Sequence, residues 1–119
     1  MKILLNVMLV VSALTELQAA AFLILGPAGL SSAGSGEMWS MHYGFAVLAV
    51  ASVSAWSWPH RNELLVMKTV IGILLVFHVG LCISLFLAGD QFVGMLIHAL
   101  IGAMCIVLFF NHRSLNKPI

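Results

Sequence analysis

Long apolar stretches, separated by polar residues, glycine and proline, dominate the chain. They cover residues 3–25, 38–58, 64–88 and 92–110. Each contains the roughly 20 mainly apolar residues that an α-helix needs to cross the hydrocarbon core of a bilayer. The breaks have the residues expected at helix ends, with Gly26-Pro27 after the first stretch, Pro59 after the second and Gly89-Asp90-Gln91 after the third. The pattern predicts four membrane-spanning helices.

The composition indicates lipid as the surrounding solvent. Of 119 residues, 62% are hydrophobic and 8% are charged, whereas a soluble domain typically has about 25% charged residues. A domain of this size leaves much of its surface exposed, so a water-soluble fold could not bury so much apolar surface. We therefore expect an all-α, four-transmembrane-helix bundle with up-down-up-down topology, forming one integral membrane domain over residues 1–119. The net charge of +1 gives no reason to expect a nucleic-acid partner.

The basic residues define an orientation in the bilayer. One side of the four-helix arrangement carries Lys2, Arg61, Lys68, Arg113 and Lys117, and the opposite connections carry only Glu37 and Asp90. Because Lys and Arg accumulate in cytoplasmic segments, we expect a multi-pass protein of the inner (plasma) membrane. Both termini, including the tail 111–119, are expected in the cytoplasm.

The first apolar stretch also has features of a signal peptide. Lys2 precedes an apolar run, and Gln18-Ala19-Ala20-Ala21 resembles a cleavage site with small residues. The apolar run continues to Leu25, however, which is longer than a usual signal segment. We expect this segment to be retained as a helix.

Ionisable residues inside a membrane cost several kcal/mol and mark candidate functional sites. The four predicted helices each contain one, in the order Glu16, His42, His78 and His98. With a rise of about 1.5 Å per residue, their depths below the outer helix ends are about 13, 6, 15 and 9 Å. All four are therefore expected in the outer half of the bilayer.

Side chains at one level of a four-helix bundle can meet at its axis and bind a metal ion. Cys82 lies one helical turn from His78, so the candidate metal ligands are Glu16, His42, His78, His98 and Cys82. A carboxylate with imidazoles suits zinc or iron, and added sulfur ligands suit copper(I). Two of His42, His78 and His98 could instead be the axial ligands of haem b. Either cofactor would give the protein a role in redox chemistry or metal handling.

A simpler interpretation needs no cofactor. An intramembrane histidine can hydrogen-bond across helices and stabilise the bundle, which would suit an accessory subunit in a homo-oligomer or a larger membrane complex. The sequence has no phosphate-binding loop, dinucleotide fingerprint, nucleophile elbow or zincin His-Glu pair, and this favours a role other than an enzyme. His60 and His112 are expected in water at the cytoplasmic interface, and Cys82 and Cys105 are expected as thiols.

Three short motifs resemble those of DoxX-like small bacterial membrane proteins with four helices. They are Pro27 after the first helix, His42-Tyr43-Gly44 at the start of the second and Gly89-Asp90-Gln91 before the fourth. The resemblance implies the architecture only, and no site residue follows from it.

The chain is also similar to small multidrug resistance transporters in its length, its four helices and an acidic residue in the first helix, here Glu16. That similarity implies proton-coupled transport of a small solute by an antiparallel dimer. The clear charge bias and the histidines of the third and fourth helices depart from the family pattern, and its aromatic substrate-binding motifs are not evident. Proton-coupled transport is therefore the alternative function.

Overall fold

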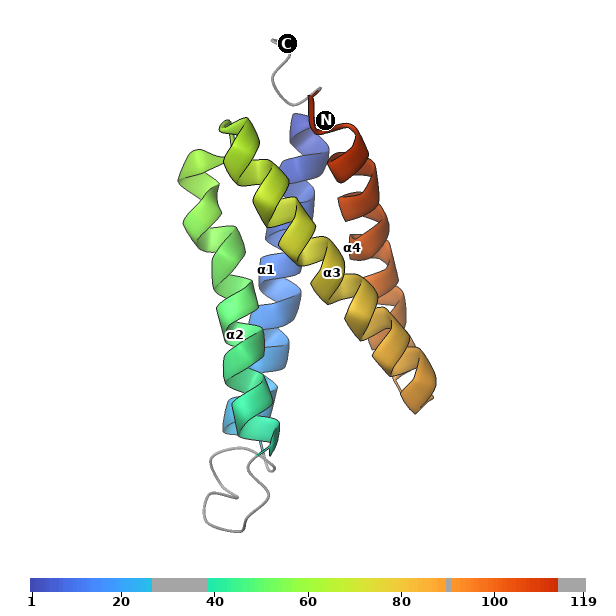
Figure 1. Cartoon of the computed structure of the whole chain (residues 1–119). Helices are drawn as coiled ribbons and strands as arrows, with labels where there is room; N and C mark the ends of the chain where they lie inside the picture. Colours follow the sequence, from blue (N-terminus) through green and yellow to red (C-terminus); the bar gives the residue numbers. More distant parts are fainter. Residues whose placement is uncertain (27–38, 90, 114–119) are drawn as a thin grey trace. The chain divides into compact units, whose positions relative to one another are not determined.

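The computed structural model describes residues 1–26, 39–89 and 91–113. In these ranges the chain forms the α-helices α1 (Lys2–Leu25), α2 (Trp39–Ser57), α3 (Leu64–Ala88) and α4 (Phe92–Phe110), and the short 3₁₀ helix η2 (Trp58–His60) (Figure 1). The same ranges contain no strand, so the expected all-α class is confirmed. The described helix ends differ from the expected bounds by no more than one residue.

Some expectations concern residues outside the described ranges. They are the loop 27–36, Glu37, the helix start at Met38, Asp90 and the tail residues 114–119 with Lys117.

Three of the described helices, α1, α3 and α4, are long and apolar enough to cross a membrane. The 19 residues of α2 include Ser40, Ser52, Ser54 and Ser57 together with His42 and Tyr43, and α2 is not among the helices that meet this criterion. The three helices that do meet it give the chain the character of a membrane protein.

The contacts between backbone segments divide the chain into two compact units. One, here called the hairpin unit, contains Met1–Leu9 and Ser57–Ile119, and the other, the α1–α2 unit, contains Val10–Trp56. We describe each unit by itself.

The hairpin unit is built on α3 and α4, which pack as an antiparallel pair (Figure 1). A Cβ atom placed on Gly94 would lie 3.4 Å from Cδ1 of Leu85, and one placed on Gly102 would lie 3.5 Å from Cγ2 of Val79. Near the other end of the pair, a Cβ on Gly72 would lie 3.6 Å from Cε2 of Phe109. Residues further along α4 thus meet residues earlier in α3. The glycines at these contacts let the two helices approach closely.

Gly89 ends α3 in the left-handed conformation, with φ of 77°. Its N–H donates to the carbonyl of Leu85 at 3.1 Å, which satisfies one of the carbonyls left open at a helix C-terminus. A residue with a side chain would be strained at this φ. The sequence prediction of a helix end at Gly89 is therefore confirmed.

The α1–α2 unit depends on a close contact between the end of α1 and the start of α2. A Cβ atom on Gly44 would lie 2.7 Å from Cγ1 of Ile24, 3.0 Å from Cβ of Leu23 and 3.2 Å from the backbone nitrogen of Ile24. Beside this contact, the Ser40 hydroxyl donates to the carbonyl of Leu23 at 3.2 Å. Glycine is required at position 44 because no side-chain atom fits there.

Gly44→Ala is therefore expected to lower the free energy of unfolding by about 1–3 kcal/mol, the usual effect of overpacking. Gly80→Ala is the matched control, because a Cβ there meets no described atom within 4 Å, and its only expected effect is a stabilisation of up to about 1 kcal/mol from the higher helix propensity of alanine. The measurement is unfolding in detergent micelles, followed by circular dichroism. Equal effects of the two substitutions would contradict the assigned contact.

Candidate metal centre

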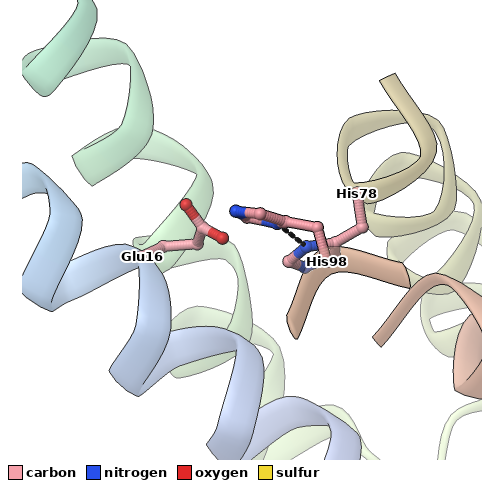
Figure 2. Close-up of side chains that lie close together, drawn as sticks. All are labelled: Glu16, His78 and His98. Carbon is pink, nitrogen blue, oxygen red and sulfur yellow. Dashed lines mark hydrogen bonds between the residues drawn. The ribbon is translucent and has the colours of Figure 1, made fainter. Parts of the chain in front are cut away.

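Two buried imidazole rings meet inside the hairpin unit. His78 of α3 is 0% exposed and His98 of α4 is 7% exposed, and their Nδ1 atoms are 2.9 Å apart in a hydrogen bond (Figure 2). A neutral imidazole has one N–H donor and one acceptor nitrogen. One ring of a neutral pair therefore donates from Nδ1 and the other accepts there, so the two histidines have different tautomers.

Phe77 packs against both rings. Its ring centroid is 5.4 Å from that of His78 and 6.4 Å from that of His98, and both contacts are edge-to-face. A Cβ on Gly102 would lie 4.0 Å from Cβ of His78, so the backbone of α4 passes close to this side chain. The imidazole pair is therefore held in place by an aromatic ring and by the close packing of α3 against α4.

The α1–α2 unit contributes a buried carboxyl group. Glu16 of α1 is 0% exposed, and so is Ser12 one turn earlier on the same helix. Burial of a carboxyl group is unfavourable unless the group is hydrogen-bonded, paired with a charge or bound to a metal ion. Glu16, His78 and His98 are thus three buried residues of the kinds that could hold a metal ion (Figure 2).

Two other candidate ligands from the sequence lie elsewhere. His42 is exposed near the start of α2, and Cys82 is half-buried on α3 with a free thiol. Neither belongs to the buried group that could hold a metal ion, and we leave both out of the proposed ligand set.

Cys105, His60 and His112 lie outside the group of residues that could hold a metal ion. Cys105 is a free, fully buried thiol on α4. His60 is exposed and bonds to Glu63, with 2.7 Å between Nδ1 and Oε1. His112 donates from Nδ1 to the carbonyl of Phe109 at 2.7 Å. The direct contact of His78 with His98 and the packing of Phe77 against both rings were not predicted from the sequence, although Phe77 is the chain neighbour of His78.

The geometry of the histidine pair distinguishes between the two kinds of cofactor. Axial histidines of a haem lie on opposite faces of the macrocycle, with the iron between them. Here the rings hydrogen-bond directly and their centroids are 5.1 Å apart, so the pair does not fit around a haem. A metal ion held at about 2.0–2.1 Å from each nitrogen needs the two nitrogens about 2.9–3.4 Å apart. The observed 2.9 Å between the Nδ1 atoms is at the short end of that range.

No protein-family model, curated protein or solved structure matches this chain. The resemblance to DoxX-like proteins therefore stays a prediction from three short motifs. The function has to be argued from the chemistry of the buried residues.

A double-mutant cycle on His78→Leu and His98→Leu tests the hydrogen bond, with chelator present throughout. Each single variant should lower the free energy of unfolding by about 1–3 kcal/mol, because it removes the partner of a buried nitrogen. The double variant should lose less than the sum of the two, with a coupling of about 0.6–1.7 kcal/mol for a polar contact between membrane helices. Additive losses in detergent unfolding would show that the two rings do not interact.

Proposed function

We propose that the chain is an integral membrane protein that holds one divalent metal ion, with His78, His98 and Glu16 as ligands. The observation that carries the proposal is the buried pair of imidazole rings with Nδ1 atoms 2.9 Å apart. Imidazole is the commonest protein ligand of transition metals. Two imidazoles beside each other in apolar surroundings form an arrangement that a metal ion can bridge.

Metal binding at the two Nδ1 atoms needs a lone pair on each. In a neutral pair, the ring that donates from Nδ1 must move its hydrogen to Nε2, and the other ring already has its hydrogen there. Binding by the two histidines thus changes one tautomer and releases no proton. Because the two nitrogens are only 2.9 Å apart, both rings would have to turn until their Nδ1 lone pairs converge on an ion beside the line that joins them.

Glu16 is the proposed third ligand because it supplies negative charge. A divalent ion held by two neutral imidazoles would retain its full charge in a medium where charge is expensive, and one carboxylate reduces that charge. Along the helices, Glu16 lies about 13 Å below the outer end, between the depths of about 9 Å for His98 and about 15 Å for His78. Two nitrogen ligands and one oxygen ligand suit zinc, iron or manganese better than copper(I).

We further propose that α2 spans the membrane with the other three helices, which gives four spans in the inner membrane and cytoplasmic termini. Its 19 residues have a length of about 28 Å at 1.5 Å per residue, close to the hydrocarbon thickness of about 30 Å. The Ser52 hydroxyl donates to the carbonyl of Ala49 at 2.7 Å. Such a bond within the helix lowers the cost of a serine in lipid.

Metal content of the purified protein tests the proposed site. The wild-type chain should carry about one metal ion, and chelator-treated protein should bind Zn²⁺ again in a calorimetric titration. Loss of a residue that only supports a metal ligand typically weakens metal binding about 10–100-fold. His78→Ala and His98→Ala should each weaken Zn²⁺ binding by at least this factor, and Glu16→Gln should weaken it by about this factor. His60→Ala and His112→Ala are matched controls that should bind as the wild type does.

Two results of this experiment would overturn the proposal. One is a protein that contains no metal and binds none of zinc, iron and manganese. The other is an equal loss of binding in the control variants. Zinc in the isolated protein would favour metal handling, because zinc has no redox chemistry, and iron would favour a redox role.

Reporter fusions test the topology. Green fluorescent protein after Ile119 should be fluorescent and alkaline phosphatase there should be inactive, because the positive-inside rule places this end in the cytoplasm. The same reporters inserted after Gly89 should give the opposite result. Phosphatase activity at both positions would contradict four spans with cytoplasmic termini.

A further inference from the structure

The short segment between α2 and α3 holds an arginine in a fixed arrangement. The Arg61 Nη1 atom donates to the carbonyl of Trp58 at 2.8 Å, and the guanidinium carbon lies 4.9 Å from the centroid of the Trp58 ring. The cation–π contact holds one face of the guanidinium group against the indole. Because a guanidinium group has five N–H donors, most of them are available to an acceptor outside the chain.

The neighbouring acidic residue does not neutralise this arginine. Glu63 bonds to Nδ1 of His60 at 2.7 Å, and within the described ranges the structure shows no ion pair for Arg61. Glu63 is also the only acidic residue among the described residues of the hairpin unit. Arg61 therefore presents an uncompensated positive charge.

Other basic residues of the hairpin unit lie at the same end. Lys2 begins α1, Lys68 lies in the first part of α3 and Arg113 follows α4, and Figure 1 shows these helix ends toward the same end of the hairpin unit. Trp58 is 37% exposed, and tryptophan is enriched at the level of the lipid headgroups. The contact with Trp58 therefore suits the Arg61 guanidinium to the level of the lipid headgroups, where tryptophan is enriched.

We propose that the segment Trp58–Glu63 binds the headgroup of an anionic membrane phospholipid, with Arg61 as the residue that contacts the phosphate. An arginine can donate two parallel hydrogen bonds to a phosphate group. The other basic residues at this end attract anionic lipid through the surface potential. The proposed ligand is a lipid because the arginine is anchored by an interfacial tryptophan at the end of membrane-spanning helices.

Quenching of Trp58 fluorescence by brominated lipids tests this proposal. The parent protein is a Trp39→Phe, Trp56→Phe variant with Trp58 as its only tryptophan, reconstituted in phosphatidylcholine vesicles. Brominated phosphatidylglycerol should quench more strongly than brominated phosphatidylcholine, and the ratio of the two gives the preference for anionic lipid. Arg61→Gln should lower that preference about fivefold, the effect expected of one basic residue at an anionic surface.

Further variants separate a headgroup site from general charge. Arg61→Lys keeps the charge but loses the planar fork, so it should retain only part of the preference. Asn62→Gln, a neutral change at an exposed neighbour, should leave the preference unchanged. Glu63→Gln should raise it, because the change removes the acidic residue of the unit. High salt should weaken the preference in the parent protein.

The ratio of the two quenchers is compared within each variant, so changes in the intrinsic fluorescence of Trp58 cancel. Circular dichroism confirms that each variant keeps its helices. Equal quenching by both lipids in the parent protein, or the same preference in Arg61→Gln and the parent, would overturn the proposal. A preference that does not rise in Glu63→Gln would overturn it as well.

Discussion

The hydrogen bond between His78 and His98 connects the packing of the hairpin unit to its chemistry. In apolar surroundings no water competes for the two Nδ1 atoms, and a polar nitrogen without its partner would be strongly unfavourable. The bond requires α3 and α4 to lie close together, and Gly102 permits this approach because it has no side chain. The same close packing seats Phe77 against both rings. The polar pair and the apolar packing around it therefore specify one register between the two helices.

Much of the fold could be predicted because helix ends and membrane solvation have strong local signals. Pro59 marks the end of α2, and Gly89 ends α3 by adopting a conformation that favours glycine. Between such breaks, lipid requires each backbone group to be bonded within its own segment, which leaves the α-helix as the only choice for a single apolar stretch. α2 is not among the helices apolar enough to cross a membrane, because serine, histidine and tyrosine reduce its hydropathy.

The candidate site could be predicted only in part because depth and direction are encoded differently. The depth of a residue follows from counting along the helix, and this singled out Glu16, His42, His78 and His98. The direction of a side chain normally follows from the contrast between polar and apolar faces, which is weak in helices that are apolar on all sides. His42 therefore has a suitable depth but is exposed, and Cys82 is only half-buried. The edge-to-face contact of Phe77 needs coordinates to be found.

The histidine pair limits where α4 tolerates a change in length. A residue inserted between Gly94 and His98 would turn the two parts of the helix by about 100° relative to each other and separate them by about 1.5 Å. The face of α4 that meets Leu85 at Gly94 would then no longer be the face that carries the His98 ring toward His78. The length of helix between Gly94 and His98 is therefore as much a part of the histidine pair as the histidines are.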